Sequence, residues 1–147
     1  MKHLLAILGA AILLIAGPLA AQDTGYDTQK VVYHINSDGQ SGTSYSAAMG
    51  NIQNHIDAVG SDSIEIEVVM HGDGLGLLMA AKEDDGLQTR VGGLKSQNVR
   101  FRICANTLKG RDIALDDLYD AWDEDVVPSG VAELSKLQQA GYTYIKP

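Results

Sequence analysis

The chain has 147 residues, a formal net charge of −8 and one cysteine. A chain of this length is expected to form one domain with a hydrophobic core of its own. Its acidic balance argues against nucleic acid and anionic membrane surfaces as partners, because both need clustered lysine and arginine. A single cysteine cannot form an internal disulfide bond, so packing of the core must hold the fold together.

Residues 1–21 predict a secretory signal peptide. A polar start, Lys2-His3, precedes an apolar run over residues 4–19 and two alanines, after which the sequence becomes polar. This run is shorter than the roughly 18 to 20 apolar residues that span a bilayer, which favours cleavage after Ala21. Leu19 is a poorer residue than alanine at the third position before that cut, so an uncleaved anchor is the alternative. We therefore expect a periplasmic protein with no membrane contact after cleavage.

The polar residues 22–29 predict a flexible N-terminal arm, followed by one α/β domain over residues 30–147. Runs of β-branched and aromatic residues predict strands over residues 30–36, 64–71, 99–104, 126–127 and 142–145. Helical spacing of apolar residues predicts helices over residues 45–59, 75–82, 87–96, 112–125 and 129–140. Strands that alternate with helices are typical of a mostly parallel sheet, here of five strands, with helices on both faces.

Seven acidic side chains gather in the predicted helix over residues 112–125. They are interleaved with apolar residues, which indicates an amphipathic helix with a solvated acidic face. The segment does not match the D-x-[DN]-x-[DN]-G spacing of a calcium loop. We therefore expect no ligand there.

The cysteine stands at the end of a predicted strand. In the segment VRFRICANTLK, residues 99–109, apolar residues alternate with Arg100 and Arg102 up to Cys104, and Asn106-Thr107 can cap a following helix. The carboxyl edge of a parallel sheet is where α/β proteins bind ligands, and a helix N-terminus lowers the pKa of a thiol. The alternative is a small buried hydrophobe. A free thiol in an oxidising compartment favours the functional interpretation.

Other polar residues follow the first two strands. Asn36 and His71 are expected at the same edge as Cys104. Cys104 and His71, alone or with His34, offer soft metal ligands, although the spacing is not a metal motif. The segment Gly72-Asp73-Gly74 lacks the lysine of a phosphate loop. We interpret it as a tight turn whose glycines let the backbone pass close to Cys104. The two arginines near Cys104 either pair with carboxylates, face a subunit interface or support the thiolate.

Several segments together resemble the DsrE/DsrF-like family, and above all its small exported members. They occur in the order KVVYHIN, NIQNHI, VVMHGDGLGLL, FRICANTL and VVPSGVAELSKLQQAGYTYIKP, and cover the chain from about Lys30 to Pro147. The resemblance implies a single-domain, three-layer flavodoxin-like fold and assembly into homo-oligomers, often trimers or hexamers. The best understood relatives are sulfur-relay proteins, in which a cysteine accepts a persulfide sulfur and passes it on.

The resemblance places the persulfide-carrying role on Cys104, with His71 to orient the thiolate or shuttle a proton. Gly72, Gly74 and Asn106 match segments that line the same edge, so with Asn36 they are expected to contact the substrate. The expected partners are a donor and an acceptor, each a thiol protein or a small sulfur compound, and no cofactor is expected. Two alternatives stay open: an oligomeric binding or scaffold protein with a buried cysteine, and a soft-metal protein that uses Cys104 and His71.

Overall fold

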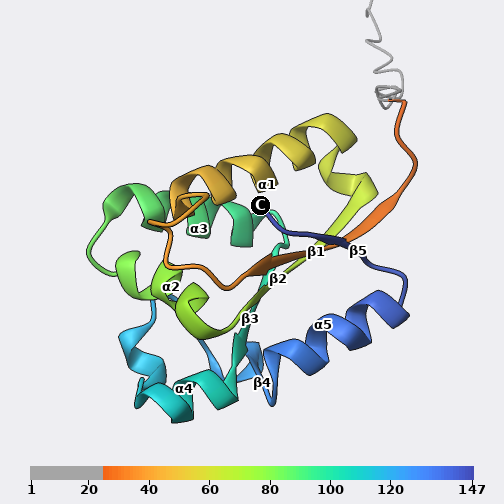
Figure 1. Ribbon diagram of the computed structural model, residues 1–147. Helices are drawn as coiled ribbons and strands as arrows, with labels where there is room; N and C mark the ends of the chain where they lie inside the picture. Colours follow the sequence, from red (N-terminus) through yellow and green to blue (C-terminus); the bar gives the residue numbers. More distant parts are fainter. Residues whose placement is uncertain (1–24) are drawn as a thin grey trace, which may run out of the picture.

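The computed structural model describes residues 25–147, which form a five-stranded sheet in the order β4-β3-β2-β1-β5 (Figure 1). All four strand pairings are parallel. The strands are β1 (Gln29–Ile35), β2 (Ile64–Met70), β3 (Arg100–Cys104), β4 (Val126–Val127) and β5 (Thr143–Ile145). The flavodoxin-like α/β architecture is therefore confirmed. The predicted signal peptide lies outside the described residues.

Helices cover both faces of this sheet, α1 and α3 on one side and α5 on the other (Figure 1). The helices are α1 (Tyr45–Val59), α2 (Gly76–Ala80), α3 (Asp85–Ser96), α4 (Ala105–Arg111) and α5 (Gly130–Gln139). Serine side chains begin α1 and α5, because Ser44 and Ser129 accept hydrogen bonds from amides of the first turn. Within residues 25–147, none of the helices is both long and apolar enough to cross a bilayer.

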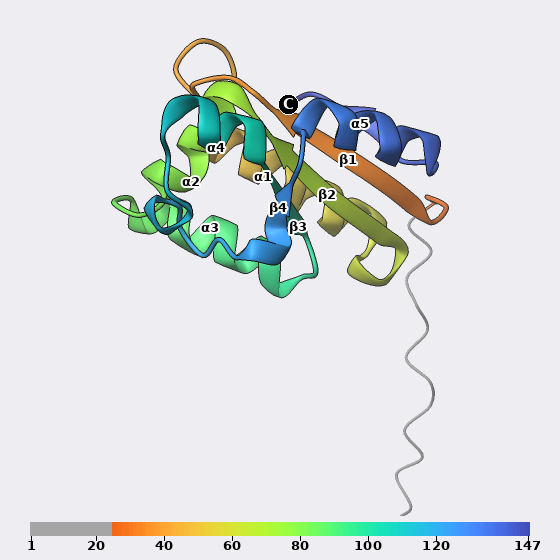
Figure 2. The ribbon, with the colours of Figure 1, turned by 90° about the horizontal axis from the view of Figure 1, so that it is seen from below.

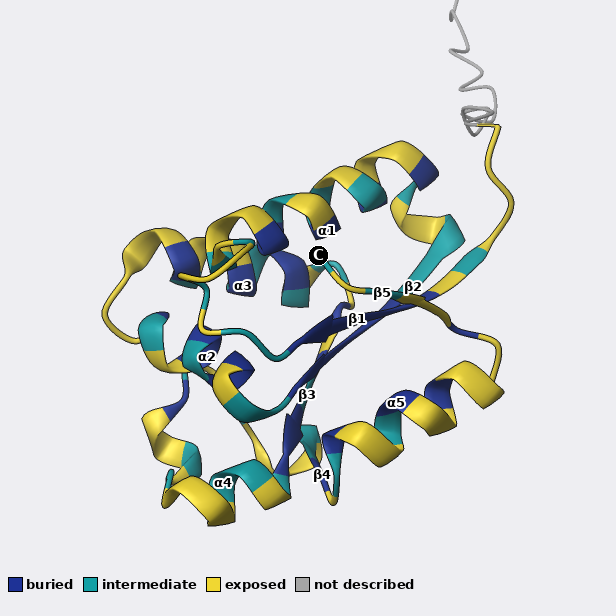
Figure 3. Ribbon diagram, in the orientation of Figure 1, coloured by how far each residue is buried: buried dark blue, intermediate teal, exposed yellow. Residues whose placement is uncertain are grey.

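The period-2 alternation of β2 divides the core into two clusters. Ile66, Val68 and Met70 pack in the larger cluster, with the apolar sides of α1, α2 and α3. Val69 points to the other face, where it packs with Val32, Leu134, Leu137 and Tyr142. The carboxyl-terminal parts of β1, β2 and β3 are buried in the middle of the domain, whereas the edge strand β5 and the outer side of α5 are exposed (Figure 3). Helix α5 lies across the face of the sheet to which Val69 points (Figure 2). By the same alternation, Glu65 and Glu67 of β2 point to this face.

The prediction of a helix over residues 112–125 is wrong. The segment contains two short 3-10 turns, Leu115–Asp117 and Asp123–Asp125, joined by a further turn in which Asp120 has a φ of +47°. In each turn an aspartate accepts a hydrogen bond from the amide three residues before it, at Ala114 and at Trp122. Aspartate side chains compete for backbone amides in this way, which favours turns over a continuous helix.

Candidate functional site

Asn36, His71 and Cys104 lie at one edge of the sheet, as the sequence predicts. The parallel register aligns Ile35 with Met70 and Met70 with Ile103, so the residues that end or follow these strands come together. Cys104 is the last residue of β3 and directly precedes α4. The polar turn expected after the cysteine is thus the first turn of a short helix.

The thiol of Cys104 is buried, with 4% of the residue exposed. This burial alone would raise the pKa of the thiol. Hydrogen bonds from the Gly130 amide, the hydroxyl and amide of Thr107, and the Asn106 amide outweigh it, so the net pKa of the thiol lies below its ordinary value. These hydrogen bonds therefore stabilise the thiolate, the nucleophilic form of cysteine, more than burial destabilises it.

Thr107 is positioned by the loop after β2. Its hydroxyl oxygen accepts a hydrogen bond from the Gly72 amide at 3.0 Å. The hydroxyl has one proton, and with its oxygen engaged by Gly72 that proton is available to the sulfur of Cys104. Asn106 contributes its backbone amide to the sulfur, whereas the residue as a whole is exposed. Sequence reasoning named Thr107 for helix capping and missed this contact, because the contact depends on the distant Gly72.

Gly130, the first residue of α5, separates His71 from Cys104. A Cβ atom added at Gly130 would lie 3.0 Å from the Cβ of His71 and 3.3 Å from the Cβ of Cys104. These distances are tighter than ordinary Cβ contacts, so a glycine lets the start of α5 lie against both residues without displacing them. The sequence contained a signal for a helix start here, Pro128-Ser129, but none for this close approach.

The loop after β2 passes close to the end of β1, a contact that the interpretation of the glycines did not include. A Cβ atom at Gly74 would lie 2.0 Å from the carbonyl oxygen of Ile35 and 3.0 Å from the Cα of Asn36. Gly74 is therefore required where the loop crosses the end of β1. Gly72 has a φ of +56°, which favours glycine, and it alone of the loop glycines connects to the thiol through Thr107.

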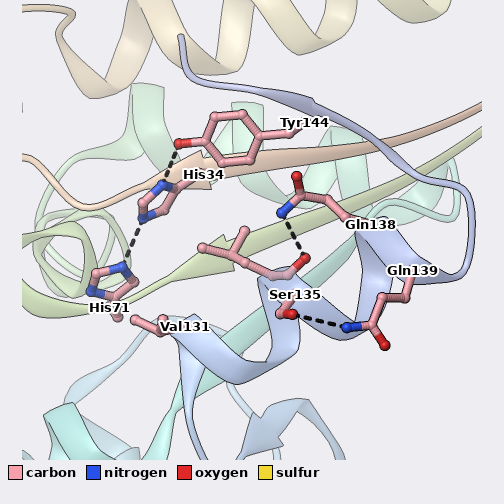
Figure 4. Close-up of a pocket in the computed structure, with 8 residues that line it drawn as sticks. His34, His71, Val131, Ser135, Gln138, Gln139 and Tyr144 are labelled. Carbon is pink, nitrogen blue, oxygen red and sulfur yellow. Dashed lines mark hydrogen bonds between the residues drawn. The ribbon is translucent and has the colours of Figure 1, made fainter.

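The imidazoles of His34 and His71 face one another beside this edge (Figure 4). Their Nε2 atoms are 2.7 Å apart, and Nδ1 of His34 is 2.7 Å from the hydroxyl of Tyr144. Burial, then the charges of His71 and Lys146, lower the pKa of His34 to about 4. Burial and Lys146 also lower the pKa of His71. Both imidazoles are therefore neutral at pH 7.

A shallow groove of about 760 Å³ opens onto these two histidines (Figure 4). It runs between α5 and the edge of the sheet, and its lining is mostly apolar. The lining residues are His34, His71, Val131, Leu134, Ser135, Gln138, Gln139 and Tyr144. Cys104 does not line the groove, but His71 reaches both the groove and, through Gly130, the surroundings of the thiol.

The two arginines of β3 pair with carboxylates of β2. Nε of Arg100 and Nε of Arg102 each lie 2.7 Å from a carboxylate oxygen of Glu67, which is 2% exposed. Arg100 also binds Glu65. Alternation along β3 places both arginines on the same face as Cys104. Their charge is nevertheless satisfied by these glutamates and by the carbonyl of Glu124, to which Arg102 donates.

These features define a small α/β protein with one polarised thiol at the carboxyl edge of a parallel sheet. The chain belongs to the DsrE/DsrF-like family, whose sequence pattern matches residues 29–147. It is 34% identical to MTH1491 from Methanobacterium thermoautotrophicum, a protein of unknown function, with a TM-score of 0.68 over 81% of this chain and 99% of that one. The ychN protein from E. coli shares the fold, with 18% identity, a TM-score of 0.61 and coverages of 81% and 99%. Among functionally curated proteins, none matches.

Proposed function

We propose that this protein carries sulfur as a persulfide on Cys104 and passes it to an acceptor thiol. Its family is generally linked to sulfur relay. The observation that carries the proposal is the set of donors around the sulfur, from Gly130, Asn106 and Thr107, which lower the pKa of the thiol despite its burial. A merely packed cysteine does not need donors of this kind, because a neutral thiol is a weak acceptor.

The reaction is two successive displacements at sulfur. The Cys104 thiolate attacks the outer sulfur of a donor persulfide R–S–SH, so a new S–S bond forms, the donor S–S bond breaks and the thiolate R–S⁻ leaves. An acceptor thiolate then attacks the outer sulfur of Cys104–S–SH, and the Cys104 thiolate is released. Each displacement moves one neutral sulfur atom with its proton, and no external oxidant or reductant takes part. The donors around Cys104 stabilise the thiolate at both ends of this cycle.

In this proposal His71 orients the approaching sulfur compound and exchanges protons with it. The support is its position, because His71 lines the groove and flanks Gly130 on the side opposite Cys104. The buried thiol must become accessible for reaction, and a small displacement of the start of α5 at Gly130 would open it toward His71. The carboxyl edge of the sheet is then held in shape by backbone contacts of Asn36, Gly72, Gly74 and Asn106. Side chains directed at the substrate are not needed at these positions.

We further propose that the protein is exported to the periplasm and that it works as a homo-oligomer, a trimer or a hexamer. The leader-like residues 1–21 support export. Support for assembly comes from family members, which are often oligomeric. The charged face of β2 and β3 beside α5 offers a surface for it, because Arg100 and Glu65 stay about half exposed after pairing.

The experiment is the intact mass of the purified protein after exposure to polysulfide, with and without reductant. A gain of one sulfur atom that reductant removes and that Cys104→Ser abolishes supports the carrier. The variant is a clean control because the chain has one cysteine. Transfer is then tested by mixing the persulfidated protein with a small thiol and following loss of the added mass. If the folded protein never gains sulfur, the proposal is wrong.

The burial of Cys104, at 4% exposure, favours a second candidate, a non-catalytic oligomeric binding or scaffold protein. This function predicts that Cys104→Ser retains assembly and cellular phenotype. It also predicts that the native thiol resists alkylation and reacts only after unfolding.

A further inference from the structure

A hydrogen bond joins the Nε2 atoms of the His34 and His71 imidazoles. Their Nε2 atoms lie 2.7 Å apart, a distance at which one nitrogen must carry a proton and the other must present a lone pair. The ring centroids are 4.7 Å apart and the ring planes differ by 28°. Two imidazole nitrogens this close together beside an open groove can share that proton or, in its place, a cation.

We propose that His34 and His71 bind a divalent transition-metal ion of the zinc class through their Nε2 atoms. Imidazole nitrogen is a preferred ligand of this class of ion. The site is distinct from Cys104, whose sulfur is engaged by Thr107, Asn106 and Gly130. It therefore goes beyond the persulfide carrier. His71 takes part in both, but metal binding does not use the sulfur and sulfur transfer does not use His34, so either function can fail without the other.

The geometry needs only a small adjustment to accept the ion. Tetrahedral coordination with bonds of about 2.0 to 2.1 Å separates two ligand nitrogens by about 3.3 Å. The nitrogens must therefore move apart by about 0.6 Å from their distance of 2.7 Å. His71 can supply this movement, because it follows the end of β2 and is partly exposed.

Tyr144 fixes the orientation of the other ligand. Its hydroxyl lies 2.7 Å from Nδ1 of His34, so the ring can donate through Nδ1 while Nε2 faces His71. Histidine ligands of metal ions commonly use their second nitrogen in this way, which orients the ring and selects its tautomer. Tyr144 belongs to β5 and His34 to β1, and the two strands pair in parallel, so the sheet itself holds this contact.

The groove determines what completes the coordination. Within residues 25–147, no group of three or more His, Cys, Asp or Glu side chains is arranged to hold a metal ion. The proposed site is thus a two-histidine site whose remaining positions are taken by water or by a ligand that enters the groove. Such an open site binds less tightly than a closed structural zinc site.

The test is calorimetric titration of Zn²⁺ into tag-free protein, with His3, outside the described residues, replaced by glutamine in every sample. We expect one Zn²⁺ per chain, and at least tenfold weaker binding in His34→Gln and in His71→Gln. His55→Gln is the matched control, because His55 hydrogen bonds to Tyr33 and Gln29 and lies outside the groove. Its affinity for Zn²⁺ should match that of the parent protein.

Two further variants separate the possible outcomes. Tyr144→Phe keeps both ligands and removes the orienting hydroxyl, so it should weaken binding by about tenfold even if a histidine variant unfolds. Cys104→Ser should bind Zn²⁺ like the parent protein. The inference is overturned if Zn²⁺ does not bind, if the His34 and His71 variants bind as well as the His55 control, or if binding depends on Cys104.

Discussion

The amide of Gly72 donates a hydrogen bond to the hydroxyl oxygen of Thr107 at a distance of 3.0 Å. This bond connects the loop after β2 with the first turn of α4, and it directs the hydroxyl proton of Thr107 toward Cys104. The acidity of the thiol therefore depends on a residue from another βα connection. The contact shows how a parallel sheet lets two loops act on one atom.

Replacement of Thr107 should make the thiol less acidic. Thr107→Val keeps the shape of the side chain but removes the hydroxyl, so the pKa of Cys104 should rise. A hydrogen bond to a charged acceptor contributes about 1.5 to 3 kcal/mol, so the rate of alkylation at neutral pH should fall about tenfold. The measurement is the rate of alkylation against pH in the folded protein. Thr107→Ser, which retains the hydroxyl, should behave like the parent; equal rates for Val and Ser would contradict the assignment.

A side chain at Gly130 should destabilise the protein. Gly130→Ala places a Cβ atom 3.0 Å from His71 and 3.3 Å from Cys104, and overpacking of this kind costs about 1 to 3 kcal/mol. Gly93→Ala is the matched control, because this helical glycine has no heavy atom within 4 Å of an added Cβ. It should stabilise the protein by about 0.5 to 1 kcal/mol. The measurement is the free energy of unfolding in urea for both variants, and equal values for Gly130→Ala and Gly93→Ala would contradict the close contact at Gly130.

Loss of the Glu67 carboxylate should lower the free energy of unfolding more than loss of an exposed carboxylate does. Glu67→Gln leaves Arg100 and Arg102 without their shared buried carboxylate, and we expect a loss of about 2 kcal/mol. This expectation is below the cost of breaking a fully buried pair because both arginines reach solvent. Asp73→Asn breaks the exposed pair with Arg111 and should change stability by less than about 1 kcal/mol. Thermal or urea unfolding that ranks the variants in the opposite order would disprove this reasoning.

The stability of the fold should fall in mild acid. Because the pKa of His34 is lowered from 6.5 to about 4 on folding, the unfolded chain binds more protons between these pH values. The stabilisation linked to neutral His34 is therefore complete above pH 6.5 and is lost as the pH falls toward 4. His71 and His55 act in the same direction. His34→Gln should flatten the free energy of unfolding between pH 6.5 and 4.5, and an unchanged slope would argue against a buried neutral His34.

The fold was largely predictable because its signals are local. Ile66, Val68 and Met70 mark one face of β2 by simple alternation, and serine caps with a closing glycine bound α1. The prediction of a helix over residues 112–125 is wrong for a local reason as well. Its aspartate side chains accept hydrogen bonds from nearby backbone amides, which favours turns over a helix.

The site was only partly predictable because its contacts are long-range. Cys104 and His71 were found from their positions at strand ends. His34 and Tyr144 are 110 residues apart, and no pattern in the sequence announces that their polar atoms meet. The sequence also does not indicate that Gly130 packs tightly, because its close neighbours, His71 and Cys104, reach it only when α5 packs on the sheet.

Helix α5 contributes to both parts of this edge. Its first residue supplies an amide to the sulfur of Cys104, and its next turns form the wall of the groove with Val131, Leu134 and Ser135. A molecule that wedges the helix outward would weaken the amide contact and make the thiol less acidic. By thermodynamic reciprocity, a chemical change at the sulfur would alter how readily the groove is filled. Through α5, binding of a ligand in the groove would thus be coupled to the acidity of the Cys104 thiol.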